Sequence, residues 1–284
     1  MSRNSDRLGI KNQGTQQPPV PEMMQQNNAL NFSVPTEFVE LPSQGKNYPE
    51  GHSLHGTDSV EIRFMTAKDE DILTSKTLLK KGLALDRLLE NIIVDKSVRP
   101  DELYIGDRNA LIVAARISGY GELYETRATC PSCETAVDTA FNLKQIGVYH
   151  GDEYEEHDIS ETDNGTYIVK LPHSKVNIEV RLLTGKDEKY LIKWAENKRK
   201  NRLPESPMTD QFKMFVVSAN GVTDQGQVHT FIETMPAADS RYLRQAYQKI
   251  VPNVDMRQEF LCTACGFEQV MEVPFTTDFF WPKR

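Results

Sequence analysis

Four cysteines limit what this chain can fold into, because they occur as two Cys-x-x-Cys pairs, Cys130–Cys133 and Cys262–Cys265. Each pair lies between two strand-like runs, which is typical of the hairpin knuckle of a zinc ribbon. Two thiolates three positions apart converge on one side of a tight turn and supply half of a tetrahedral site. Two knuckles supply four sulfur ligands, so the sequence predicts one structural Zn²⁺ bound by Cys130, Cys133, Cys262 and Cys265.

Other chemistries of paired cysteines fit the sequence less well. A redox pair needs a thioredoxin-like βαβ setting with a helix after the first cysteine, and here strands flank both pairs. Structural disulfides suit secreted proteins, whereas the segment that begins at Met1 is polar and lacks the apolar core of a secretory signal. Four thiolates can also bind an iron–sulfur cluster, although knuckle hairpins are more typical of zinc.

The cysteine pairs are far apart in the sequence because the chain contains an internal repeat. Val60–Leu73 aligns with Ile178–Leu191 at an offset of 118 positions, with seven of fourteen residues identical. Further along, the offset is 132, and it relates four pairs of residues: Asp107 and Asp239, Leu111 and Leu243, Ala114 and Ala246, Cys130 and Cys262. The second copy therefore carries about fourteen extra residues, part of them in the polar stretch 198–207. The sequence therefore predicts one unit used twice, each copy donating one knuckle.

The repeat predicts the fold class and the domain boundaries. We expect an α+β protein in which two homologous strand–helices–β-hairpin units are joined through a shared four-cysteine, zinc-ribbon-like site. The first unit spans residues 36–148 and the second spans 166–284. Residues 149–165 form an acidic linker, since seven of the twelve residues 152–163 are Asp or Glu; such a run is a solvated loop or a contact for a basic partner. Residues 1–35 are rich in Gln, Asn and Pro and predict a disordered polar arm.

Local patterns predict the elements of the first unit. The turn-rich segment 41–56 is expected to be an ordered loop, and ordered structure is expected to begin with a strand at 60–65. Thr66 is placed as the N-cap of a helix with acidic residues in its first turn. Asp107 is placed as the cap of a further helix. The segment 124–130 again alternates as a strand does.

No pattern points to catalysis. Gly119-Tyr-Gly121 resembles part of a phosphate loop, but it follows a helix and predicts a helix-terminating turn. His52 and His55 are predicted to pack within their loop rather than to bind a metal. The sequence lacks the nucleophile-elbow, zincin and Walker A motifs. We therefore predict no catalytic residues, no small-molecule substrate and no enzyme activity.

One basic stretch stands out from a chain whose net charge is -8. It contains Lys186, Lys189, Lys193, Lys198, Arg199, Lys200 and Arg202. It reads either as a solvated helix face or as a docking surface for an acidic protein or a nucleic acid. Trp194, within it, is predicted to belong to the core. The negative net charge argues against nonspecific DNA binding by the whole chain, and no apolar run is long enough to span a membrane.

Several segments resemble the T4-type phage baseplate protein family. They are the segment 41–52, the segment 61–73, Gly106-Asp-Arg-Asn-Ala110 and the knuckle Cys130-Pro-Ser-Cys133. The resemblance extends over about residues 36–284 and leaves the polar arm outside. Members are associated with the baseplate hub or central spike complex and its assembly.

The resemblance implies a non-catalytic structural or assembly component of a contractile phage tail baseplate. It implies other baseplate or tail proteins as partners, and a location in the virion tail after assembly in the host cytoplasm. Thiols stay reduced in that compartment and are free to bind zinc. A zinc-ribbon regulator that binds nucleic acid through residues 186–202 is the alternative that the residues leave open.

Overall fold

Helices, β-hairpins and a four-stranded sheet make up the described part of the chain, which is residues 33–274 and 279–280 of this computed structural model. The predicted α+β class is confirmed. The arm predicted for residues 1–35 lies outside the described residues except for its last three. The predicted disorder of residues 1–32 is therefore not addressed by the structure.

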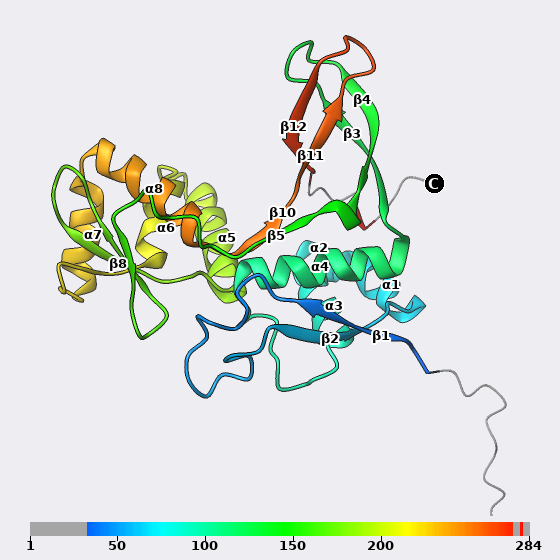
Figure 1. Cartoon of the computed structure of the whole chain (residues 1–284), viewed down its shortest axis with the longest axis horizontal. Coiled ribbons are helices and arrows are strands. Elements are labelled where there is room, and N and C mark those ends of the chain that lie inside the picture. The colour runs from blue at the N-terminus through cyan, green and yellow to red at the C-terminus, as the bar shows by residue number, and fades with distance from the viewer. Residues whose placement is uncertain (1–32, 275–278, 281–284) are drawn as a thin grey trace, which may run out of the picture. The chain divides into compact units, whose positions relative to one another are not determined.

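In the first half of the chain, four helices follow one pair of strands and precede a second pair, and the long fourth helix lies between the two pairs in space (Figure 1). Its elements are β1 (Thr36–Glu40), β2 (Ser59–Arg63), α1 (Ala67–Thr74), α2 (Lys76–Lys80), α3 (Ala84–Ile92), α4 (Ile105–Tyr120), β3 (Leu123–Thr129), β4 (Ala136–Asn142), the 3-10 turn η1 (Leu143–Gln145) and β5 (Gly147–Tyr149). Sequence reasoning missed β1 and started the ordered structure at residue 60, because a five-residue strand beside a polar arm has little periodicity of its own.

The second half follows the same order with additions. Its elements are β6 (Ile159–Glu161), β7 (Tyr167–Lys170), β8 (Asn177–Val180), α5 (Gly185–Lys200), α6 (Pro207–Phe215), β9 (Val216–Ala219), α7 (Gln225–Thr234), α8 (Ala237–Ile250), β10 (Asn253–Asp255), β11 (Arg257–Leu261) and β12 (Glu268–Glu272). Strands β6, β7, β8 and β9 form one antiparallel sheet in that order. Strand β6 lies within the acidic segment between the halves.

The opening strand pairs of the two halves have the same register. In the first, Val39 pairs with Val60, and the amide of Leu41 donates to the carbonyl of Asp58. In the second, Val169 pairs with Ile178, and the amide of Leu171 donates to the carbonyl of Val176. The two leucines are followed by proline in both halves. The similarity therefore begins upstream of the repeat that the sequence alone indicates.

A capping box starts the helix that follows each strand pair, as predicted for Thr66. The Asp69 carboxylate accepts hydrogen bonds from the amide and hydroxyl of Thr66, each at 2.8 Å. It also accepts two from the Arg63 guanidinium, at 2.7 and 3.0 Å. In the second half, Asp187 accepts the corresponding bonds from Thr184 and Arg181. The arginine that ends β2 and the arginine that directly follows β8 are thereby each tied to the first turn of the next helix.

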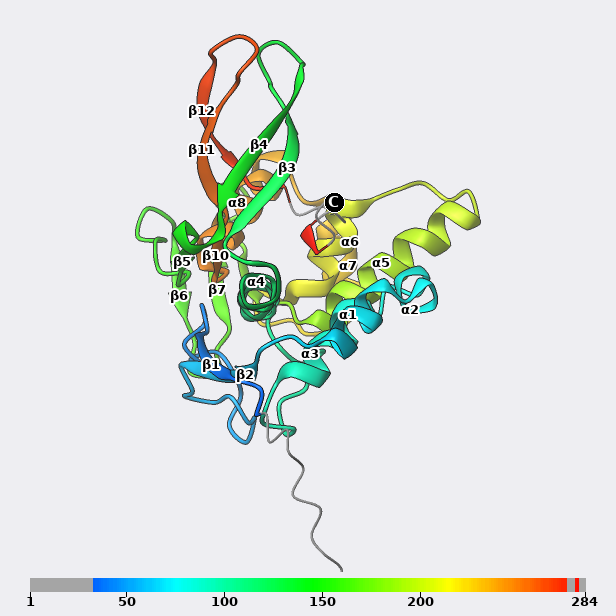
Figure 2. The ribbon, with the colours of Figure 1, turned by 90° about the vertical axis from the view of Figure 1, so that its right-hand side faces the viewer.

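Helix α4 lies at the centre of the described structure, between the strand pair β1–β2 and the two long hairpins (Figures 1 and 2). It is buried on most of its sides. Asp107 is in its first turn but does not cap it, since the N-cap residue is Tyr104. The Asp107 carboxylate instead accepts from the amide and hydroxyl of Ser43 and from the hydroxyl of Tyr48. The predicted cap is thus wrong, and the carboxylate holds the loop 41–56 against the helix.

Contacts at the N-terminal end of α4 connect the two halves. The buried Arg108 guanidinium contacts Asp86 of α3 at 3.1 Å and Glu188 of α5 at 2.6 Å. Gly106 packs so closely that a Cβ atom would lie 2.0 Å from the carbonyl oxygen of Pro252. The glycine is therefore required by the close approach of the backbone after α8.

Residues from the end of the chain complete the core of the first half. Met256, Val273, Phe279 and Phe280 are buried in the same apolar cluster as Leu111 and Tyr124. The buried Arg116 of α4 donates to the carbonyl oxygens of Phe279, Gly121 and Leu123.

A second apolar cluster lies between the sheet of the second half and its helices. It includes Val169, Val180, Phe212, Phe215 and Tyr247. None of the helices among residues 33–274 combines the length and apolar character needed to cross a bilayer.

Candidate metal centre

The two cysteine pairs form nearly identical knuckles at the tips of two hairpins, β3–β4 and β11–β12 (Figure 1). In the first, the Cys130 amide donates to the carbonyl of Thr135, and the Glu134 amide donates to the carbonyl of Cys130. In the second, Cys262 pairs in the same way with Phe267 and Gly266. Glu134 and Gly266 have φ values of +57° and +72°, the left-handed turn expected after the second cysteine.

The four sulfur atoms come together across the hairpins, and all lie within 4.8 Å of one another. Cys130 Sγ is 3.8 Å from Cys265 Sγ, and Cys133 Sγ is 3.8 Å from Cys262 Sγ. A tetrahedron with metal–sulfur bonds of about 2.3 Å has edges of about 3.8 Å. The thiols are free, too far apart for disulfides, and spaced so that they could hold a metal ion.

The side chains of the knuckles differ in exposure and in pKa. Cys130 and Cys262 are buried, whereas Cys133 and Cys265 face solvent. Hydrogen bonds from Thr135 lower the pKa of Cys133 to about 6, which favours a thiolate at neutral pH. A backbone hydrogen bond from Phe267 lowers the pKa of Cys265, but the hydrogen bonds with Cys133, Cys262 and Cys130, together with desolvation, outweigh it and raise that pKa to about 12. A cation that binds here must release a proton from Cys265, so its affinity falls in acid.

Two sets of contacts below the cysteines keep the hairpins side by side. A small apolar cluster contains Ala128, Cys130, Val137, Phe260 and Cys262. Nearer the base, the Gln258 side chain accepts from the amide of Asn142 at 3.1 Å and donates to its carbonyl at 2.8 Å. The Gln258 amide thus bonds to the backbone of β4 as a neighbouring strand would. Sequence reasoning missed this residue, because a single glutamine in a strand carries no distinctive signal.

The other candidate side chains lie apart from the cysteine cluster. His52 stacks on Tyr48 with ring centroids 4.4 Å apart, and His55 Nδ1 is 2.6 Å from the carbonyl oxygen of Tyr48. Their predicted role in loop packing is confirmed. Gly121, with φ +83°, ends α4 as predicted. Among the described residues, the four cysteines are the group of three or more His, Cys, Asp or Glu side chains whose ligand atoms lie close enough together to hold a metal ion.

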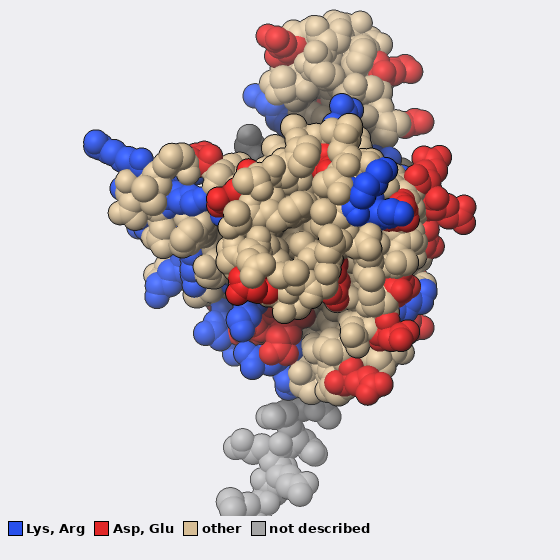
Figure 3. Space-filling view, turned by 90° about the vertical axis from the view of Figure 1, so that its left-hand side faces the viewer, with Lys and Arg blue, Asp and Glu red and all other residues tan. Residues whose placement is uncertain are grey.

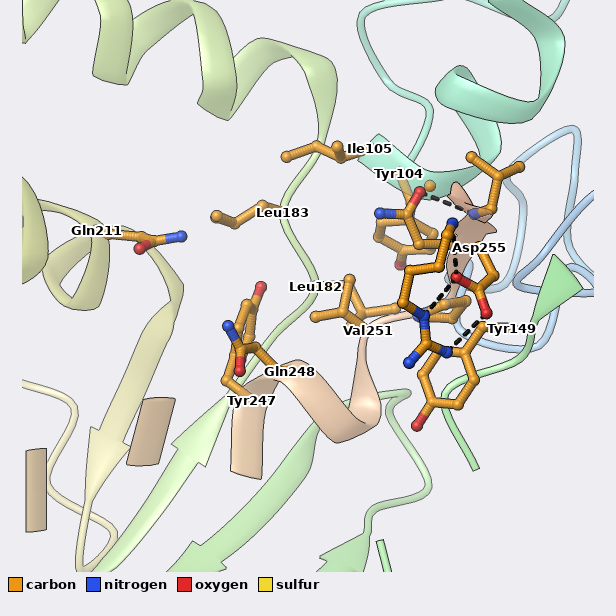
Figure 4. Close-up of a pocket in the computed structure, with 15 residues that line it drawn as sticks. Tyr104, Ile105, Tyr149, Leu182, Leu183, Gln211, Tyr247, Gln248, Val251 and Asp255 are labelled. Atoms are coloured by element: carbon orange, nitrogen blue, oxygen red, sulfur yellow. Dashed lines mark hydrogen bonds and ion pairs between the residues drawn. The ribbon is translucent and has the colours of Figure 1, made fainter. Parts of the chain in front are cut away.

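A cavity of about 340 Å³ lies where α4 meets the end of α8 (Figure 4). Leu182, Leu183 and Val251 form its apolar wall, with Gln211 and Tyr149 toward opposite ends. Its charged groups, Arg257 and Asp255, are 2.6 Å apart and pair with each other. The lining therefore presents no unpaired charge to a ligand.

The fold and the thiol cluster define an α+β chain with a four-cysteine site able to hold a metal ion. The particular family follows from comparison with family models. The chain belongs to the family described as T4 bacteriophage base plate protein, whose model matches residues 34–281. The resemblance stated from the sequence is thus confirmed. Neither the search of curated proteins nor that of solved structures finds a match.

Membership of this family makes the chain a phage tail baseplate protein, for which other tail proteins are the natural partners and the virion tail the natural location.

Proposed function

We propose that this protein is a non-catalytic structural or assembly component of the hub or central region of the baseplate, stabilised by Zn²⁺ bound to Cys130, Cys133, Cys262 and Cys265. Family membership supports the role in the tail. The sulfur spacing of 3.8 Å across the two knuckles is the observation that supports the metal.

Zinc is the metal that best suits this ligand set. Four thiolates from two knuckle hairpins favour a soft or borderline cation in tetrahedral geometry, and Zn²⁺ accepts that geometry without redox chemistry. With four protein ligands the ion would have no position for water, so it would stabilise the fold rather than activate a substrate. The two ligand pairs come from different halves of the chain and would join those halves.

We further propose that the halves arose by duplication of one unit, with the first copy in residues 36–148, an acidic linker in 149–165 and the second copy in 166–284. The matching strand registers and the matching Arg–Thr–Asp clusters support this. So do the helix ends: the residue after α3, Ile93, pairs with Ile62, and the residue after α6, Val216, pairs with Val180. The difference in residue number between corresponding positions is 118 for Ile62 and Val180, 123 for Ile93 and Val216, and 132 for Asp107 and Asp239. The extra residues of the second half therefore lie before α6 and around α7.

Metal analysis tests the zinc proposal directly. Protein purified without chelator is expected to contain about one Zn²⁺ per chain, and Cys130→Ser and Cys262→Ser should lose both the metal and stability. At free zinc a thousandfold above Kd, binding contributes about 4 kcal/mol, so chelation should lower the unfolding midpoint markedly. Ser132→Ala changes an exposed residue of the same knuckle and serves as the matched control. Wild-type protein that folds normally without metal would contradict the proposal.

Fractionation of infected cells tests the role in the tail. We expect the protein to co-purify with baseplate intermediates and to bind DNA or RNA no more tightly than other acidic proteins do. A salt-sensitive complex with nucleic acid and no association with tail proteins would instead favour a zinc-ribbon regulator.

A further inference from the structure

Helix α5 is largely exposed, although it carries two large aromatic side chains. Of its sixteen residues only Gly185 is buried. Trp194 is 43% exposed and Tyr190 is 55% exposed, so the prediction that Trp194 belongs to the core is wrong. The two rings lie 6.3 Å apart and nearly parallel, at 10°. Exposed aromatic side chains are typical of binding surfaces, whereas a helix face that only meets solvent is usually polar.

The aromatic pair forms one wall of a groove of about 620 Å³. Helices α6 and α7 supply the opposite wall, and the lining residues include Leu191, Met214, Gln225 and His229. The Lys198 ammonium lies 5.6 Å from the Trp194 ring centroid and is held there by Asp210 at 2.6 Å. A groove of this volume accommodates one or two large apolar side chains, with polar groups at its rim to orient them.

Unpaired positive charge runs along the edge of this groove. Lys186, Lys193 and Lys200 are exposed and recur at intervals of seven, which places them on one face of α5 next to the aromatic face. No ion pair to another described residue involves their ammonium groups. In Figure 3 the Lys and Arg side chains gather toward the left edge, and many of the Asp and Glu side chains lie toward the right. Figure 2 shows the molecule from the opposite side, with α5 projecting on the right, so the left edge of Figure 3 is the side of α5.

From these observations we propose that the groove between α5, α6 and α7 binds an acidic peptide segment of a partner protein, with an aromatic or long aliphatic side chain between Tyr190, Trp194 and Met214. The lysine stripe would attract the carboxylates that flank this side chain. The chemistry of the ligand is inferred from the groove alone. Only the identity of the partner as a neighbouring tail protein rests on the proposed function.

Charge pairing favours a peptide over a nucleic acid. Several cations near the groove are already neutralised: Lys189 by Asp86, Lys198 by Asp210 and Lys213 by Glu233. The carboxylates of these pairs, together with Glu188 and Glu196 on α5 itself, would repel a continuous phosphate backbone. A short segment that combines a few carboxylates with one apolar anchor suits both the charge and the apolar walls.

The chain's own N-terminal segment, residues 1–32, is a poor candidate for this groove. Residues 1–32 contain three basic side chains, Arg3, Arg7 and Lys11, and two acidic ones, Asp6 and Glu22. Their net charge has the same sign as the lysine stripe. Electrostatic complementarity therefore points to a different chain.

Selection from a random peptide library on the zinc-loaded full chain tests the proposal without a tail particle. Enriched peptides, resynthesised with fluorescein, are expected to carry Asp or Glu around Trp, Phe or Leu. In fluorescence anisotropy, Trp194→Ala should weaken their binding at least about tenfold, as for an aromatic hot spot. Lys193→Glu should weaken it several-fold, with the larger effect at low salt.

Two matched variants control for general effects on the helix and on charge. Ile192→Ala removes a side chain that is as exposed as Tyr190 and that lines a separate depression beside Arg108 and Ile112. Lys80→Glu reverses an exposed charge on α2 in the first half. Both should bind within about twofold of wild type, since neither contributes to the groove. All four variants should keep the wild-type circular dichroism spectrum.

Four outcomes would overturn the proposal: enrichment of basic or uncharged peptides, unchanged binding by Trp194→Ala, tighter binding of a double-stranded DNA oligomer through Lys193, or self-association of the chain abolished by Trp194→Ala. Each is observed with purified protein, so a failure here is distinct from a failure to co-purify with tail intermediates.

Discussion

Replacing Asp69 by Asn tests how much the strand-to-helix cluster contributes to stability. The side chain is fully buried and accepts hydrogen bonds from Arg63, Thr66 and Asn91. Asparagine has nearly the same shape but no negative charge, and its amide nitrogen cannot accept from the guanidinium. Asp187→Asn makes the same change in the second half, where Asp187 is 15% exposed and its partner Arg181 is 36% exposed.

The magnitude follows from the pKa of Asp69. Burial by itself raises this pKa, but hydrogen bonds from Arg63, Thr66 and Asn91 together outweigh burial and lower the pKa from 3.8 to about 2. Each pKa unit corresponds to about 1.4 kcal/mol, so the ionised Asp69 contributes about 2 kcal/mol to folding at neutral pH. Because the folded pKa is depressed, this stability is present above pH about 4 and is lost as pH falls toward 2.

The assay is urea unfolding of wild type and Asp69→Asn from neutral pH down to about pH 3, with the m-value monitored for two-state behaviour. We expect a difference in unfolding free energy of about 2 kcal/mol at neutral pH that shrinks in acid. Release of the proposed zinc ion in acid would affect both proteins and would cancel in the difference. Asp187→Asn should have the smaller effect, because its more exposed pair is better screened by water.

Two results would refute this reasoning. A difference that stays constant from neutral to acidic pH would mean that helix capping, rather than the charge of Asp69, is what the variant loses. An Asp187→Asn effect equal to or larger than that of Asp69→Asn would mean that burial does not set the strength of the pair.

Two further predictions concern the junctions of the fold. Gly106→Ala should destabilise the protein by about 3 kcal/mol or abolish soluble expression, since the added Cβ meets the Pro252 carbonyl at 2.0 Å, whereas Gly226→Ala near the start of α7 should change the thermal midpoint little. Gln258→Leu should lower the free energy of unfolding by about 2 kcal/mol, because it removes both hydrogen bonds to the Asn142 backbone. The loss is measurable as faster hydrogen exchange of the Asn142 amide, and wild-type protection of that amide would contradict the bridging role of Gln258.

Much of the candidate site could be predicted from the sequence because its chemistry is local. A cysteine pair three residues apart between two strands has few alternatives, and the structure brings Cys130 and Cys262 to one point. The capping box at Thr66 was also predictable, since it depends on residues within one turn. The relation of the two knuckles to each other was predicted from the sequence similarity between Val60–Leu73 and Ile178–Leu191.

Features that depend on long-range packing could not be predicted. Asp107 resembles a helix cap in sequence, yet the loop around Ser43 and Tyr48 uses its carboxylate instead. Trp194 resembles a core residue, yet α5 projects from the body and leaves the ring exposed. Strand β1 was missed because only its pairing with β2 defines it. In each case the deciding partner lies outside the local sequence window.

The burial of Phe279 and Phe280 in the core of the first half has a consequence for synthesis. The ribosome makes that half first, but the aromatic residues that complete its interior emerge only after the second half. A chain released early would lack them and leave Arg116 without the carbonyl of Phe279. Truncated translation products should therefore be poorly folded in the first half, which would keep incomplete copies out of a growing particle.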